Sequence, residues 1–140
     1  MSAPSRRSRE RFKSRRNTGW FFRIDVAVLD SPAYCGLSFK SRALLFDLGA
    51  QYRGNNNGDL AAPWSWMKGR GWKSKDTLQR ALRELLEAGL IEQTRQGGLH
   101  CATLYAFTWL GIDECGGKLE VRANPVPSNL WRRAALQTAA

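Results

Sequence analysis

Histidine and cysteine are scarce in this sequence, which contains one histidine, His100, and three cysteines, Cys35, Cys101 and Cys115. An odd number of cysteines without a Cys-x-x-Cys pair predicts neither a disulfide framework nor a zinc site, and it fits a reducing compartment. Neighbouring residues on a strand point to opposite faces, so we do not expect His100 and Cys101 to share a metal. With one histidine and no paired-carboxylate or nucleophile motif, the sequence predicts no enzyme, no cofactor and no small-molecule substrate.

Long apolar runs are also missing. No run approaches the roughly 18 residues that a membrane-spanning helix needs, and no signal-peptide apolar region follows the basic start. We therefore expect a cytoplasmic protein without a membrane partner. At 140 residues and 43% hydrophobic content, the chain can build one core.

Acidic residues are few, with 12 Asp and Glu against 22 Lys and Arg, for a formal net charge of +10. Residues 1–16 hold seven of these cations and a single acid, Glu10, so they account for +6. Such a charged segment, with Phe12 as its one large apolar residue, cannot bury enough surface to fold. We expect residues 1–18 to form a disordered basic arm. It either contacts DNA phosphates or a minor groove, through Arg6, Arg7, Arg9 and Arg11, or serves only as a solubilising tail.

A well-defined amphipathic helix is predicted in the second half of the chain. Ser74 is a good N-cap because its hydroxyl can accept a hydrogen bond from a first-turn amide, and Asp76 suits the positive end of the helix dipole. Gly89 supplies a left-handed stop. Between them, apolar residues recur at helical spacing and predict a buried stripe: Leu78, Ala81, Leu82, Leu85 and Leu86.

The opposite face of this predicted helix consists of long polar side chains that cluster in its first two turns. In a helix that lies in the major groove of DNA, these turns meet the base edges. A solvent-exposed surface helix with no ligand would show the same pattern. The sequence on either side of the helix therefore has to distinguish a DNA-binding helix from an ordinary surface helix. The candidate DNA-binding residues around the helix are Lys73, Ser74, Lys75, Asp76, Thr77, Gln79, Arg80 and Arg83, with Arg95 in the hairpin that follows.

The flanking sequence predicts two more helices and a hairpin. Pro63 is well placed to start a helix that runs to Arg70 and ends at Gly71, and Ser38 is a good cap for a helix over residues 39–52. We expect that earlier helix to bury Leu44, Leu45, Leu48 and Tyr52. Residues 90–94 and 99–109 predict two antiparallel strands around a Gln-Gly-Gly turn at residues 96–98.

This order of elements resembles a winged helix-turn-helix domain, an α+β fold with a three-helix core and a C-terminal two-stranded β-hairpin wing. The chain specifically resembles the DNA-binding domains of bacterial mobile-element regulators and of phage and plasmid origin-binding replication proteins. The resemblance covers roughly residues 24–110, and it departs at Met67, where a small residue is usual, and at the bulky Trp64, Trp66 and Trp72. The residues that resemble the family are Leu29–Tyr34, Leu37-Ser38, Arg42–Leu45, Tyr52–Leu60, Ser74, Thr77, Arg80–Leu82, Leu85, Gly89–Ile91, Ala102-Thr103 and Thr108-Trp109.

We therefore expect an arm at residues 1–18, a winged helix-turn-helix domain at residues 19–110 and a C-terminal extension at residues 111–140. In the extension, Ser128 or Asn129 could cap a short helix from Leu130 to about Gln137, which either docks on the core or makes a dimer contact. The Gly54–Gly58 loop lacks the lysine of a phosphate-binding loop, so we interpret it as a structural turn.

The resemblance implies a sequence-specific, nucleoid-associated binder of double-stranded DNA that regulates transcription or DNA replication of a mobile element. A homodimer is a further candidate partner. One alternative is a winged helix that binds a host or element-encoded protein through exposed tryptophans or its C-terminal helix. A weaker one, single-stranded nucleic-acid binding, rests on the 15 aromatic residues.

Overall fold

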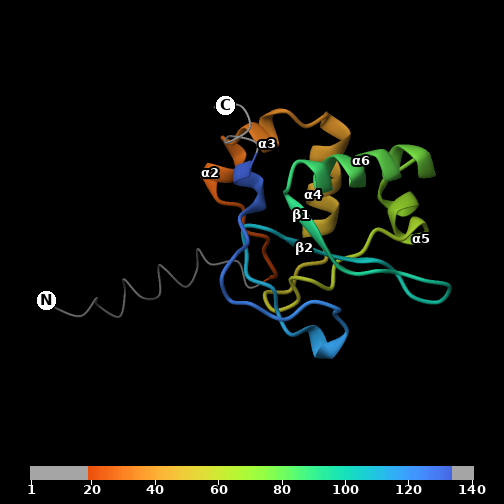
Figure 1. The fold of residues 1–140 in the computed structure, drawn as a ribbon. Helices are drawn as coiled ribbons and strands as arrows, with labels where there is room; N and C mark the ends of the chain where they lie inside the picture. The colour runs from red at the N-terminus through yellow and green to blue at the C-terminus, as the bar shows by residue number, and fades with distance from the viewer. Residues whose placement is uncertain (1–18, 134–140) are drawn as a thin grey trace, which may run out of the picture.

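The computed structural model describes residues 19–133, in which the main helices precede a β-hairpin (Figure 1). Two short helices, α2 (Val26–Leu29) and α3 (Pro32–Cys35), lead into the first main helix, α4 (Phe39–Gly49). Ser38 caps α4 as predicted, since its hydroxyl oxygen accepts a hydrogen bond from the Ser41 amide at 3.3 Å.

The end of α4 differs from the sequence prediction, because the helix stops at Gly49 and Tyr52 lies beyond it. The chain turns at Gln51, whose side-chain amide pairs with both backbone groups of Ala61 at 2.6 and 3.0 Å. The backbone carbonyl of Gln51 accepts a further hydrogen bond, from the side-chain amide of Asn56 at 2.9 Å. These bonds direct the backbone away from the helix axis. They explain why the helix predicted from sequence, which extended to residue 52, was longer than α4.

The second and third main helices meet at a tight corner. Helix α5 (Trp64–Met67) continues as the 3₁₀ turn η1 (Lys68–Arg70), with Pro63 at the N-cap instead of the first helical position that the sequence suggested. Gly71 then adopts φ 101°, a left-handed conformation that favours glycine. Helix α6 (Lys75–Glu87) follows, and its predicted cap at Ser74 is present, with the Thr77 amide 3.4 Å from the hydroxyl oxygen.

The hairpin consists of β1 (Ile91–Arg95) and β2 (Leu104–Phe107), paired antiparallel with a register shift between Gln93 and Arg95. The prediction that the second strand starts at Leu99 was wrong: residues 96–103 form a loop that closes through a Gly98–Cys101 bridge. The Gly97 amide donates to the Thr103 hydroxyl at 3.0 Å, which displaces this stretch from regular pairing. Leu60 adds one further bridge, to Tyr105 on β2.

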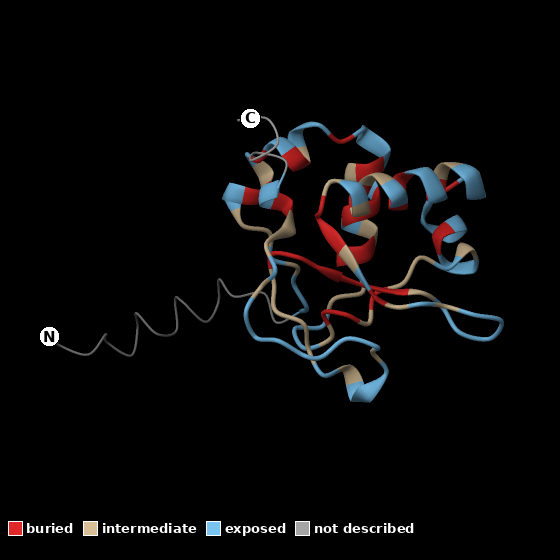
Figure 2. Cartoon of the chain, in the orientation of Figure 1, coloured by how far each residue is buried: buried red, intermediate tan, exposed pale blue. Residues whose placement is uncertain are grey.

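Helices α4 and α6 pack together on one side of the hairpin, and buried residues of both helices and of β1 and β2 form the core (Figure 2). The core leucines Leu44, Leu45 and Leu48 of α4 and Leu85 of α6 are fully shielded from solvent. Burying each such side chain stabilises the fold by about 1.5–3 kcal/mol. Residues 19–133 thus form a small α+β domain of three main helices followed by a two-stranded hairpin.

The C-terminal segment runs back along the domain and ends beside α2 and α3 (Figure 1). Trp131, in the 3₁₀ turn η3 (Leu130–Arg132), is 7% exposed and belongs to the core, so this segment docks. The Asn129 side chain does not cap a helix but accepts a bond from the Trp131 indole at 3.1 Å. The predicted continuation to Gln137 lies outside the described residues from residue 134 onward.

Candidate nucleic-acid interface

The outward face of α6 is polar along its first turns. Its inward side chains Leu78, Leu82 and Leu85 are between 0% and 4% exposed, so the positions between them face solvent. The predicted base-contacting side chains are all exposed there: Lys75, Asp76, Gln79, Arg80 and Arg83. None of the side-chain hydrogen bonds or ion pairs within residues 19–133 involves these five, so they are available to a ligand.

A cleft next to the start of α6 brings together cations from α4, from η1 and from the turn between η1 and α6. It has a volume of about 230 Å³ and includes the predicted residues Lys73, Ser74 and Thr77. Lys40, from the first turn of α4, and Arg70, from η1, also line it. Sequence reasoning missed both cations as site residues. Lys40 is 33 positions from Lys73 in sequence, and only the packing of α4 against the corner between η1 and α6 brings it to the same cleft.

Asp47 of α4 fixes the position of that corner. Its carboxylate accepts a hydrogen bond from the Trp72 indole nitrogen at 2.8 Å and a second from Arg70 Nε at 3.1 Å. The Asp47 side chain is only 15% exposed, so both bonds are partly shielded from water. The corner that leads into α6 is therefore held to α4 by one carboxylate that accepts two donors.

Positive charge is concentrated in this part of the described chain. Residues 68–83 contain six Lys and Arg against one acid, Asp76, whereas the rest of residues 19–133 contains nine cations against ten acids. The net charge outside residues 68–83 is thus slightly negative. A localised positive potential of this kind attracts a polyanion to one face of a protein.

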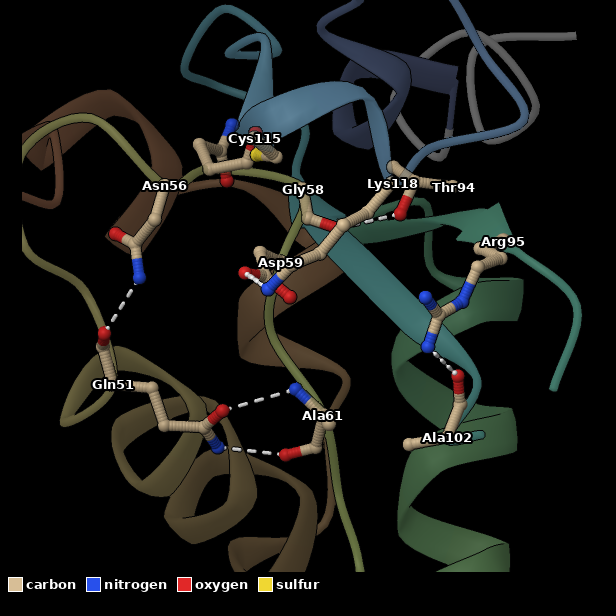
Figure 3. A network of polar contacts seen from close by, with 11 residues as sticks. Gln51, Asn56, Gly58, Asp59, Ala61, Thr94, Arg95, Ala102, Cys115 and Lys118 are labelled. Atoms are coloured by element: carbon tan, nitrogen blue, oxygen red, sulfur yellow. Dashed lines mark hydrogen bonds and ion pairs between the residues drawn. The ribbon is translucent and has the colours of Figure 1, made fainter. Parts of the chain in front are cut away.

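The hairpin lies beside this face and is poor in charge. Gln79 of α6 shares a groove of about 260 Å³ with Thr103 and Tyr105 of the hairpin. Residues 96–103 contain no lysine or arginine. The predicted phosphate contact Arg95 is half-buried and donates to the Ala102 carbonyl at 2.8 Å, as Figure 3 shows. Arg95 thus holds the two arms of the hairpin together, unlike the exposed cations of α6.

The glycine- and asparagine-rich loop has a structural role, as predicted. Asn57 is fully buried. Its side-chain nitrogen Nδ2 donates hydrogen bonds to the backbone carbonyls of Phe107 at 3.0 Å and Gly111 at 2.8 Å. Its side-chain oxygen Oδ1 accepts one from the Phe107 backbone amide at 2.8 Å. The Gly58 carbonyl accepts from the Thr94 hydroxyl at 2.6 Å (Figure 3). These bonds connect the loop to the hairpin and to the segment after it.

The arm contacts Arg6, Arg7, Arg9 and Arg11 lie outside the described residues. Within residues 19–133, no group of three or more His, Cys, Asp or Glu side chains is placed to hold a metal ion. In the same range, every helix is too short or too polar to cross a membrane.

No family model matches this chain, and no curated protein or solved structure is similar enough to it to count as a match. Its function therefore has to be inferred from the geometry described above.

Proposed function

We propose that this protein binds double-stranded DNA sequence-specifically, as a winged helix-turn-helix. In this proposal α5, η1 and α6 form the helix-turn-helix, α4 supports it from behind, and the β1–β2 hairpin is the wing. The arrangement is favoured by the left-handed turn at Gly71, by the anchoring of Trp72 to Asp47, and by the hairpin that lies beside α6. The single observation that carries the proposal is the exposed, unbonded polar face of α6.

Helix α6 supplies the base contacts in this proposal. An α-helix fits the major groove, where arginine and lysine donate to guanine and glutamine pairs with adenine. Gln79, Arg80 and Arg83 combine these chemistries on one exposed face, with Lys75 and Asp76 in the first turn. Asp76 suits the N4 amino group of cytosine, because a carboxylate can only accept hydrogen bonds.

Phosphate contacts come from the cations around the start of α6. Lys40, Arg70 and Lys73 surround one cleft at this end of the helix, and Ser74 and Thr77 contribute polar groups to it. The arginines of residues 1–16, which lie outside the described residues, would add further contacts to the DNA phosphates. The uncharged loop of the hairpin would contribute shape rather than charge.

The biological role in this proposal is regulation of transcription or replication of a mobile genetic element, in the cytoplasm and at the nucleoid. It is supported by the resemblance of residues 24–110 to DNA-binding domains of phage and plasmid proteins. Selecting bound sequences from a random duplex pool tests the proposal directly. We expect one enriched motif; a pool that stays random after several rounds would contradict sequence-specific binding.

A protein-binding winged helix is the second candidate, and one observation favours it. Helix α4 exposes two large apolar side chains, Phe39 at 81% and Phe46 at 53%. Exposed apolar side chains of this size on one helix are typical of contact surfaces. Replacing both phenylalanines by serine should leave duplex binding unchanged under the first proposal, and it should abolish partner binding under the second.

A further inference from the structure

A groove with exposed aromatic walls lies where the described chain begins, apart from the DNA-reading face of α6. Its volume is about 560 Å³, within the range of pockets that hold small organic groups. Trp20, Phe21 and Arg23 line it from the segment before α2, Tyr52 from the turn after α4, and Leu110 from the chain that follows the hairpin.

The aromatic residues of this groove are not part of the core. Trp20 is 70% exposed and Phe21 is 76% exposed. The next residue, Phe22, packs against the core: its ring centroid lies 4.9 Å from that of Phe107 and 6.0 Å from that of Trp109. Phe22 thus anchors this segment to the hairpin, and its two aromatic neighbours remain open to a ligand.

Two arginines lie near the aromatic walls. The Arg53 guanidinium lies 5.9 Å from the centre of the Trp20 ring and also donates to the backbone carbonyls of Ala50 and Tyr52. The Arg23 side chain lines the groove, is 66% exposed and pairs with Asp25 at 3.1 Å. The +6 segment of residues 1–16 precedes Trp20 by only a few residues in sequence. A ligand that suits this groove therefore has flat aromatic groups and repeated negative charge.

We infer that this groove binds unpaired nucleotides of a single-stranded nucleic acid, whose bases stack on Trp20, Phe21 and Tyr52 while phosphates meet Arg23 and Arg53. Stacking on aromatic side chains needs the faces of the bases, which are covered by neighbouring bases in an intact duplex. The proposed duplex site on α6 offers donors and acceptors but no aromatic side chain among its five base-contacting residues. The groove is therefore a second nucleic-acid site, with a different preference from the first.

Fluorescence anisotropy of the full chain with a labelled oligothymidine of about 12 nucleotides tests this inference, since single-strand sites span roughly 4–16 nucleotides. The double variant Trp20→Ala/Phe21→Ala should bind the oligomer roughly five- to hundredfold more weakly, and its affinity for a selected duplex should not change. Trp20→Phe should retain most of the single-strand affinity, because it keeps an aromatic face.

Phe39→Ala is the matched control, because Phe39 is as exposed as Phe21 but lies at the other end of α4 from Tyr52. This variant should bind both probes like the parent chain. The reciprocal variant Arg80→Ala should lose duplex affinity alone, so that failure of the α6 proposal and failure of this one give different results.

Three outcomes would overturn the inference: no binding of the parent chain to the oligomer, equal binding by the double variant, or equal losses on oligomer and duplex. Photo-crosslinking of the parent chain to an oligomer that contains 5-iodouracil gives a readout that does not depend on how the variants fold. Adducts should map to Trp20, Phe21 or Tyr52; adducts confined to α6 would contradict the site. Oligothymidine and oligouridine probes used side by side distinguish DNA from RNA as the source of the unpaired bases.

Discussion

Glu84 of α6 accepts two hydrogen bonds from Ser38, one from its backbone amide and one from its hydroxyl at 3.0 Å. Ser38 is the N-cap of α4. The Glu84 carboxylate of α6 therefore provides a hydrogen-bond acceptor for a backbone amide at the N-terminus of α4. Burial disfavours the charged carboxylate of Glu84. The hydrogen bonds from the Ser38 amide and from the Ser41 and Ser38 hydroxyls outweigh this effect, and they lower its pKa.

This contact predicts a pH dependence of stability. A carboxyl group whose pKa is lowered in the folded state stabilises the fold at pH values above its unfolded pKa, about 4.3, and loses this contribution as the pH falls through the lower folded value. Glu84→Gln should therefore reduce the free energy of unfolding by about 0.5–1 kcal/mol at pH 7, since it removes a charge from a helix N-terminus. The difference should shrink below about pH 4. Thermal melting between pH 7 and pH 3 measures it.

Glu87→Gln is the control for this experiment. Glu87 is an exposed acid of the same helix, and it has no side-chain bond to other residues of 19–133. Because Glu87 is the last residue of α6, its replacement should leave stability at pH 7 unchanged or slightly raised, and should not lower it. If Glu84→Gln and Glu87→Gln gave the same melting curves, the contact with Ser38 would contribute nothing measurable.

Base reading by α6 is tested by the double variant Gln79→Ala/Arg80→Ala. Both side chains are exposed and lie outside the buried stripe, so the fold should remain intact. Loss of each base contact should cost roughly 1–3 kcal/mol on a selected duplex and much less on a random one. Gel-shift titration on both duplexes measures the change, with circular dichroism as the check on folding.

Arg122→Ala is the matched control for that variant, because Arg122 is an exposed arginine in the C-terminal segment, outside the cationic stretch of residues 68–83. It should bind both duplexes like the parent. Unchanged binding of the Gln79/Arg80 double variant to the selected duplex would show that another face of the protein reads the bases.

The structural role of the asparagine-rich loop is tested by comparing two neighbouring asparagines. Asn57→Ala leaves the Phe107 amide without its acceptor inside the core and should destabilise the fold by at least about 1–3 kcal/mol. Asn55→Ala should have no effect, because Asn55 is exposed and none of the side-chain hydrogen bonds within residues 19–133 involves it. Chemical denaturation of both variants gives the comparison. Equal stabilities would contradict the assignment of Asn57 as the residue that connects the loop to the hairpin.

Helix α6 was predictable from sequence because its signals are local: the Ser74 cap, the buried leucines and the left-handed Gly89 all act within about one turn of their positions. The bonds between Glu84 and Ser38 were not predictable, since they join residues 46 positions apart. The same reason applies to the cleft beside α6, because Lys40 and Lys73 line it together only after α4 has packed. Predictions failed where side chains compete with regular backbone pairing, as Gln51 does after α4 and Thr103 does before β2.

Deleting the N-terminal arm should lower the affinity for duplex DNA without changing the stability of the fold. Deletion of residues 1–16 removes a formal charge of +6, and the composition of this segment, with Phe12 as its one large apolar residue, predicts that it contributes little to the core. The melting temperature should therefore stay within about 1–2 °C of that of the parent, because no substantial apolar surface is lost. Affinity for any duplex should fall at the same time, since fewer phosphates are neutralised.

Salt dependence shows how the arm acts. If about four to six of its cations meet phosphates, the slope of log affinity against log salt should become shallower by roughly 4 to 5 on deletion, because each contact contributes about −0.9 on B-form DNA. An arm that grips only the backbone should give similar losses on selected and random duplexes. An arm whose arginines enter a narrow minor groove should give a larger loss on the selected site. Fluorescence anisotropy of both chains across a salt series measures these slopes, and an unchanged slope on every duplex would mean that the arm is only a solubilising tail.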